Sequence, residues 1–395
     1  DLSDNIIHLV LARRAGAPDN VKGISLFVVP KFLVNDDGSL GERNPVSCGA
    51  LEKKMGIHGN STCVMNYDGA KGWLVGEPEK GLQAMFIMMN AARLGVGLQG
   101  IAQGEVAYQN AANYARERSQ GRALRPDERE EGAKADSIIV HPDVRRMLME
   151  ARAWNEAGRA LVLWGALQVD LMRRSPDEEE RILADDLLGL ITPVIKGYLT
   201  DKGFQAAVYA QQVLGGHGYI REHGMEQFVR DARITQIYEG TNGIQAMDLV
   251  GRKLPKDGGR AVRTFIERVG HEIADSKLNG DPAGVAAALE PALQDLQAAT
   301  MWLAQNGMAD PNNAGAGAYP YMELMGVVAL GWMWLKMALA SAKAIADGAE
   351  DRQFHEAKLA TARFYAAREL PLSIALRRRV EAGADTVMKI PAEAF

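Results

Sequence analysis

The sequence predicts a mainly α-helical protein: a partial antiparallel β domain, then a four-helix bundle, then an additional C-terminal helical domain. Short β-type runs separated by turn residues fill roughly the first 75 positions. From Gly81 onward, apolar residues recur at three- and four-residue spacings. After residue 256 the composition becomes richer in alanine. We therefore expect domain bounds at 1–78, 79–255 and 256–395.

The β region contains three runs of strand type: IIHLVLA, ISLFVVP and TCVMNYDGA. Gly, Asn, Asp and Pro clusters separate them, as is typical of turns. The first two runs should pair across APDNVKG, with Gly23 or Asn20 in the tight turn. An isolated pair of strands is only marginally stable, so further strands are expected.

Four long helical segments are expected to form the bundle. The first covers 81–118, as one helix or two, and is followed by the polar break ALRPDEREEGAKADS. The second starts near Pro142, because proline suits the first turn of a helix. A third covers 185–214 and should bend or break near Pro193. The fourth is expected over 234–254. Alternating apolar faces on these segments favour an antiparallel arrangement.

The C-terminal region is expected to contain helices over about 260–306 and 320–380. The segment DPNNAGAGAYP between them is predicted to be a flexible joint.

Composition excludes several classes of function. The 395-residue chain is 47% hydrophobic with a net charge of -5, so it has a sizeable core and no concentrated basic surface for nucleic acid. Only Cys48 and Cys63 are present, which suggests a reducing, cytoplasmic compartment. No uninterrupted apolar run reaches roughly 18 residues, since VVALGWMWLKMALA is cut by Lys336, so no membrane contact is expected. The histidines show no metal-ligand spacing, and no metal site is predicted.

Two neighbouring motifs carry the chemical information. The first is QQVLGGHGYIREHG, where bare glycine backbone could approach an anion, although such a run after a helix is more often a C-cap and turn. The second is FVRDARITQIYEGTNGIQ, which places Glu239 between a tyrosine and a glycine. Glu239 is either a solvated turn residue or a base aimed into a pocket.

In their order and spacing, the two motifs resemble the acyl-CoA dehydrogenase signature, in which GGxG(F/Y) leads through RDA to IYEGT. The stretch 52–97 resembles the family's passage from its middle β domain into its C-terminal bundle, and the resemblance covers about residues 1–250. The chain therefore looks like a C-terminal portion of the family's layout. Together with HPDVRRML and ERSQGRAL, the C-terminal helices resemble the subgroup that includes 3-methylmercaptopropionyl-CoA dehydrogenase.

The resemblance implies α,β-desaturation of an acyl-CoA thioester, with a carboxylate taking the α proton and FAD taking the β hydride. Glu239 matches that carboxylate. Gly240 would lie beside the thioester, and Asn90 and Arg93 would line the channel for CoA and the acyl chain. The implied pathway is fatty acid metabolism, with an electron-transfer flavoprotein as electron acceptor.

The resemblance also implies a set of cofactor contacts. Gln212, Gly215 and Gly216 match a stretch that receives the adenine half of FAD from a neighbouring subunit, which implies a homodimer or homotetramer. The order Arg118-Ser119-Gln120-Gly121 lacks the family's usual aromatic residue before the glycine. The residues implied to contact FAD are Arg118, Gln212, Gly215, Gly216, Thr241, Asn242 and Gly243.

Two alternatives remain at this point. An acyl-CoA oxidase uses the same base and flavin but passes electrons to oxygen. A non-catalytic or DNA-associated relative with the same fold would need a dense basic face on the last domain. The run LRRRV at 376–380 is basic, but acidic residues surround it.

Overall fold

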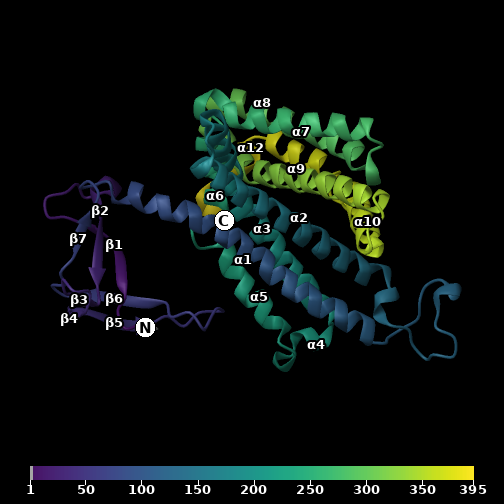
Figure 1. The fold of residues 1–395 in the computed structure, drawn as a ribbon, viewed down its shortest axis with the longest axis horizontal. Coiled ribbons are helices and arrows are strands. Elements are labelled where there is room, and N and C mark those ends of the chain that lie inside the picture. The colour runs from purple at the N-terminus through teal and green to yellow at the C-terminus, as the bar shows by residue number, and fades with distance from the viewer. Residues whose placement is uncertain (1–2) are drawn as a thin grey trace. The chain divides into compact units, whose positions relative to one another are not determined.

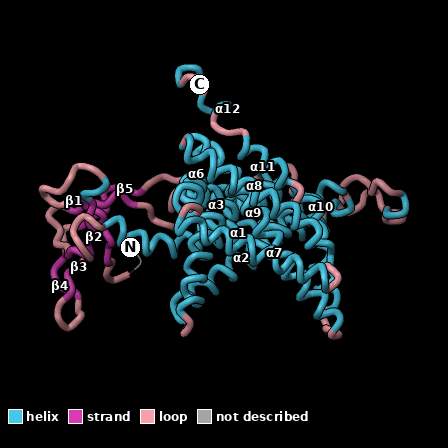
Figure 2. The backbone as a smooth tube through the Cα atoms, turned by 90° about the horizontal axis from the view of Figure 1, so that it is seen from above, coloured by secondary structure: helices cyan, strands magenta, loops and turns pink. Residues whose placement is uncertain are grey.

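The structure is a computed structural model that describes residues 3–395. The chain divides into two compact units, Asp1–Ala92 and Arg93–Phe395, and helix α1 runs through the boundary between them. The strands of the described residues all precede α1, and the second unit is built of helices (Figures 1 and 2). The mainly α-helical fold class is confirmed, whereas the expected domain bounds at 78 and 255 stay predictions.

The first unit contains three small antiparallel sheets. Strand β2 lies between β1 and β7, β3 pairs with β4, and β5 pairs with β6. The predicted pairing of the first two runs is confirmed, with Ile7 opposite Pro30 and Arg13 opposite Ile24. The strands are β1 Ile7–Arg13, β2 Ile24–Pro30, β3 Phe32–Val34, β4 Leu40–Arg43, β5 Val46–Leu51, β6 Cys63–Tyr67 and β7 Trp73–Val75.

The connection between β1 and β2 differs from the expected tight turn. Within this connection, the residue with a positive φ is Gly16, at 79°. Asn20 is extended and caps a short 3₁₀ helix by accepting a hydrogen bond from the Lys22 N–H. Asn20 and Gly23 still close a tight turn, since the Gly23 N–H donates to the Asn20 carbonyl oxygen at 3.0 Å, but this turn is one part of a longer connection.

Three long helices begin the second part of the fold: α1 Gly81–Glu117, α2 Pro142–Arg174 and α3 Glu178–Val213. α3 starts earlier than the expected 185, because Asp177 caps it through the Glu179 N–H and three glutamates fill its first turn. It also continues through Pro193 without a break. Pro193 is buried, and packing against α2 and α9 overrides the helix-breaking tendency of the ring.

The fourth expected segment is not one helix. It consists of a 3₁₀ turn at Ile234–Gln236, an irregular stretch, α6 Asn242–Asp248 and one π-helical turn at Leu249–Lys253. The interruption falls at Glu239 and Gly240, which both have positive φ. Two further short helices, α4 Gly216–Tyr219 and α5 Met225–Arg233, lie between α3 and this segment.

The C-terminal region is helical throughout most of its length. The predicted joint at 310–320 is wrong, because Pro311 lies in the first turn of α9 and Asp310 caps that helix by accepting from the Asn312 N–H. The helices are α7 Arg260–Leu278, α8 Val285–Ala309, α9 Pro311–Ala346, α10 Arg352–Arg368, α11 Leu372–Glu381 and α12 Asp385–Met388.

One hydrophobic core joins the bundle to the C-terminal helices. α9 packs against α2, α3 and α6 on the bundle side and against α8, α10 and α11 on the other. Its Trp332 and Trp334 are fully buried. A second, smaller core of alanines and methionines lies between α1, α2, α3 and α5. It brings the end of α1 close to the end of α3, where the motif glycines lie.

Two helices within the described residues are long and apolar enough to cross a membrane: α1 and α9. This result rests on length and composition alone, and α9 contains Lys336 and is not an uninterrupted apolar run. In α9, 78% of the most apolar window is buried inside the structure, against 28% in α1. α9 is thus a core helix of the second unit.

Candidate active site

Glu239 lies in a strained turn between the 3₁₀ turn at Ile234–Gln236 and α6. Its φ is 57°, and the following Gly240 has a φ of 86°. A left-handed conformation costs a residue with a side chain about 1–2 kcal/mol, so the surrounding structure must hold it. The carboxylate atom Oε2 is buried and has no hydrogen-bond partner among the described residues. A solvated turn glutamate would not show this combination.

Two side chains hold the backbone of this turn. Arg93, only 7% exposed, donates from Nε to the Glu239 carbonyl oxygen at 3.3 Å. Gln245 donates from Nε2 to the carbonyl oxygens of Glu239 and Gly240, both at 3.3 Å. Gly240 suits this turn because its φ of 86° is one that residues with a side chain rarely adopt, and a Cβ there would also press on Gln245 Nε2 at 2.7 Å.

Asn242, 4% exposed, anchors the C-terminal side of the turn. Its Oδ1 accepts from Lys196 Nζ at 2.8 Å, and its Nδ2 donates to Asp201 Oδ1 at 2.8 Å. Asp201 also accepts from Gln236 Nε2 at 2.6 Å and from the Tyr319 hydroxyl at 2.5 Å. A polar network, buried at Lys196 and Asn242 and part-buried at Asp201 and Tyr319, therefore connects α3, α6 and α9.

Lys196 is fully buried within this network. The pKa of its ammonium group is lowered to about 8, chiefly by burial and also by the Arg93 guanidinium, while the carboxylates of Asp201 and Glu239 oppose the shift. The folded protein therefore releases this proton at a lower pH than the unfolded chain does.

The Lys196 ammonium group should make the free energy of unfolding depend on pH in the alkaline range. Between pH 8 and 10.5 the unfolded chain holds the proton that the folded chain has released, so stability rises with pH by up to about 1.4 kcal/mol for each unit. Below pH 8 both the folded and the unfolded chain hold the proton, so the loss of stability caused by burying the charged ammonium group does not change with pH. Urea unfolding at pH 7, 8, 9 and 10 should show this rise in the wild type and not in Lys196→Met. The exposed Lys134→Met is the matched control, and a Lys196→Met profile parallel to the wild type would contradict the assignment.

A cavity of about 460 Å³ opens on the solvent side of the anchored turn. Thr241, Asn242 and Gly243 contribute to its wall, together with Arg233 of α5 and Tyr319 of α9. The Thr241 hydroxyl accepts from the Ile244 N–H at 3.3 Å and so caps α6. The three residues that the sequence suggested as cofactor contacts are thus adjacent: Thr241 and Gly243 are exposed, whereas Asn242 is buried.

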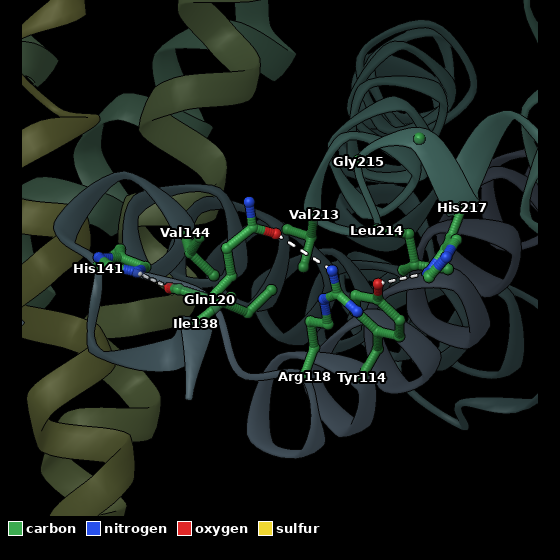
Figure 3. Close-up of a pocket in the computed structure, with 11 residues that line it drawn as sticks. Tyr114, Arg118, Gln120, Ile138, His141, Val144, Val213, Leu214, Gly215 and His217 are labelled. Atoms are coloured by element: carbon green, nitrogen blue, oxygen red, sulfur yellow. Dashed lines mark hydrogen bonds between the residues drawn. The ribbon is translucent and has the colours of Figure 1, made fainter. Parts of the chain in front are cut away.

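A second cavity, of about 420 Å³, lies where α1 ends and α4 begins (Figure 3). Arg118 donates from Nη2 to Gln120 Oε1 at 3.2 Å, and the hydroxyl of Tyr114 lies 2.8 Å from His217 Nδ1. Gly215, with a φ of 58°, and Gly216 form part of the wall, and nothing lies within 4 Å of a Cβ built on either glycine. The backbone is therefore open to a ligand.

The two cavities suit the parts of an anionic dinucleotide such as FAD. The cavity of Figure 3 combines the Arg118 guanidinium with bare glycine backbone, which is a donor set for phosphate. The cavity beside Thr241 adds a hydroxyl and the guanidinium of Arg233, and the carboxylate of Asp201 also lines it, already accepting hydrogen bonds from Gln236, Asn242 and Tyr319. Within residues 3–395, no group of three or more His, Cys, Asp or Glu side chains is arranged to hold a metal ion.

The structure brings together most, not all, of the predicted site residues. Glu239, Gly240 and Arg93 form one cluster, and Arg118, Gly215 and Gly216 share one cavity. Gln212 is exposed on the last turn of α3, and Asn90 is exposed on the part of α1 that belongs to the first unit. Sequence reasoning missed Lys196, Asp201, Gln245 and Tyr319. Lys196 alone had a signal, a lysine inside the apolar run LITPVIKGYL.

Two family models match the chain. The model described as acyl-CoA dehydrogenase, C-terminal domain, covers residues 79–254. The model described as acetyl-CoA dehydrogenase C-terminal like covers residues 261–391.

Curated relatives match over nearly the whole chain. A 3-methylmercaptopropionyl-CoA dehydrogenase from Ruegeria pomeroyi is 43% identical over 98% of this chain, which spans 65% of that protein. The broad-specificity linear acyl-CoA dehydrogenase FadE5 from Mycobacterium tuberculosis is 35% identical over 100% of this chain, which spans 67% of it. The chain therefore spans about two thirds of the length of these relatives, and the suggested subgroup resemblance is confirmed.

Solved structures share the fold. The ACDH-11 protein of Caenorhabditis elegans, in complex with C11-CoA, superposes with a TM-score of 0.76 at 19% identity, over 98% of this chain and 61% of that one. An acyl-CoA dehydrogenase complexed with FAD from Bacillus anthracis gives a TM-score of 0.71 at 19% identity, over 95% of this chain and 60% of that one. Fold, family models and curated relatives agree, and the chain belongs to the acyl-CoA dehydrogenase family.

Proposed function

We propose that this chain carries the catalytic base and part of the flavin site of an FAD-dependent acyl-CoA dehydrogenase. The observation that carries the proposal is the Glu239 carboxylate: its Oε2 is buried without a partner, on a backbone held at a φ of 57°. Strained residues with unsatisfied buried groups concentrate at functional sites. Membership of the family supports the assignment of this group to proton abstraction.

Bound FAD supplies the acceptor for the β hydride. Glu239 takes the α proton of the acyl thioester onto its unpartnered oxygen. Arg93 and Gln245 fix the direction of the backbone that carries the carboxylate, by donating to the Glu239 carbonyl oxygen. Because these contacts exist before substrate binds, the base needs no rearrangement to act. Asn90 is proposed to line the substrate channel with Arg93.

The cofactor residues are proposed to act across subunits. Arg118, Gly215 and Gly216, with the nearby Gln212, would receive the adenosine diphosphate part of FAD from a neighbouring subunit. Thr241, Asn242 and Gly243 would contact the flavin's phosphate region. The bundle also exposes large apolar side chains, which favour contact with another subunit of a homodimer or homotetramer. These are Leu98 and Val106 of α1 and Leu163 and Leu167 of α2.

We assign the substrate to acyl-CoA thioesters, including 3-methylmercaptopropionyl-CoA, and the electron acceptor to an electron-transfer flavoprotein. The free thiols of Cys48 and Cys63 support a cytoplasmic setting. A DNA-binding role is less well supported, because two arginines of the LRRRV run are already paired. Arg377 contacts Asp295 at 3.1 Å and Arg379 contacts Glu323 at 3.3 Å.

Anaerobic mixing of the full-length protein with a panel of acyl-CoA thioesters tests this function. Saturable bleaching of the flavin is expected with linear acyl-CoAs or 3-methylmercaptopropionyl-CoA, and none with free CoA. Rapid reoxidation by an electron-transfer flavoprotein, and slow reoxidation by dioxygen, would separate a dehydrogenase from an oxidase. Absence of bleaching with every thioester would overturn the proposal.

A further inference from the structure

The hydroxyl of Tyr319 joins the C-terminal helices to the polar network around Asn242. Tyr319 lies in the third turn of α9 and donates to Asp201 Oδ2 at 2.5 Å. Burial and the neighbouring Asp201 carboxylate raise the pKa of this tyrosine, so its hydroxyl remains a donor over the working range of pH. Asp201 in turn accepts from Asn242 through its other oxygen, at 2.8 Å.

Asn242 has only one orientation that satisfies its partners. A lysine ammonium group donates and cannot accept, and a carboxylate accepts and cannot donate. Asn242 Oδ1 therefore faces Lys196, and its Nδ2 faces Asp201. Thr241, Gly243 and Ile244 around it are exposed, so Asn242 is the buried anchor of this stretch.

The anchor matters because Glu239 lies only three positions earlier, in a conformation that its own side chain disfavours. Arg93 and Gln245 hold its carbonyl oxygen at distances of 3.3 Å, which are long for strong hydrogen bonds. The shorter bonds of Asn242 and Asp201 thus carry much of the restraint on the turn.

We propose that Tyr319 is a positioning residue for the base: through Asp201 and Asn242, helix α9 fixes the turn that aims the Glu239 carboxylate. The inference rests on the proposed function, in which Glu239 is the base. It gives the C-terminal helices a part in the reaction although they contribute no residue that touches the reacting atoms.

Tyr319→Phe and Tyr321→Phe form a matched pair. Both remove one hydroxyl from α9, but Tyr321 is fully buried and its hydroxyl lies 2.8 Å from Thr300 Oγ1, away from the network. Loss of a hydrogen bond to a charged group should lower the rate constant for flavin reduction about tenfold in Tyr319→Phe, with little change in KM. Tyr321→Phe should keep the wild-type rate constant.

A second readout does not depend on turnover. In the protein without substrate, amide hydrogen exchange over residues 239–245 should be faster in Tyr319→Phe than in the wild type and Tyr321→Phe. Wild-type exchange and wild-type flavin reduction in Tyr319→Phe would overturn the inference. Equal losses in both variants would also overturn it, since they would show general loosening of α9. If Glu239→Gln reduces flavin normally, the proposed function itself fails, and the two failures are distinguishable.

Discussion

The Glu239→Gln variant is expected to keep its flavin and to lose flavin reduction by acyl-CoA. Glutamine preserves the shape of the side chain and has the same difficulty with a positive φ, so the fold should be as stable as the wild type. The neutral amide of glutamine cannot accept the α proton. General-base catalysis is worth about 10²–10⁴-fold in rate, and abstraction from so weak a carbon acid belongs near the upper end.

Stopped-flow bleaching of the flavin under anaerobic conditions measures this loss in the full-length protein. Glu222→Gln, which changes an exposed glutamate near the end of the first motif, is the matched control and should reduce flavin at the wild-type rate. Slowing by less than about tenfold in Glu239→Gln would mean that another carboxylate is the base. Asp248, which lies 4.0 Å from Arg93, would then be the first to examine.

Gly203→Ala is expected to give the largest loss of stability. A Cβ at this position in α3 would lie 2.0 Å from the carbonyl oxygen of Gly100 in α1. Backbone atoms cannot rotate away as a side chain can, so the two helices must separate. Overpacking of a tight core typically costs 1–3 kcal/mol, and we expect about 3 kcal/mol or more here.

Gly189→Ala in the same helix is the matched control for this substitution. Nothing lies within 4 Å of a Cβ built on Gly189, so the substitution should stabilise the protein by up to about 1 kcal/mol through the higher helix propensity of alanine. Urea unfolding midpoints should therefore move in opposite directions for the two variants. Midpoints that fall together, or a Gly203→Ala midpoint equal to the wild type, would show that α1 and α3 are not packed this closely.

Local patterns were sufficient for the regular parts of the fold. The pairing of β1 with β2 and the span of α1 follow from periodicity, and the start of α2 follows from Pro142. Local patterns failed where contacts between distant residues determine the backbone conformation. Pro193 looks like a helix breaker along the sequence, yet it lies buried inside α3. Glycine and asparagine at 312–317 are typical of a loop, but the packing of α9 makes this segment helical.

In the candidate site, too, some residues could be predicted from the sequence and others could not. The motif around Glu239 was recognisable because its residues are consecutive and their order is distinctive. The residues that hold it are far apart in the chain: Arg93 lies 146 positions before Glu239, and Tyr319 lies 118 positions after Asp201. Neither Asp201 nor Tyr319 belongs to a local pattern. Only the packing of α9 against α3 and α6 reveals that they meet.

The shared core around α9 also bears on how such chains can evolve. Exchange of C-terminal segments between relatives, with a crossover near residue 255, would place a foreign α9 against the resident α2, α3 and α6. Volume mismatches would arise along the whole length of the helix, from Tyr319 near its start to Trp334 further on. Substitutions in the two halves should therefore accumulate as compensating pairs.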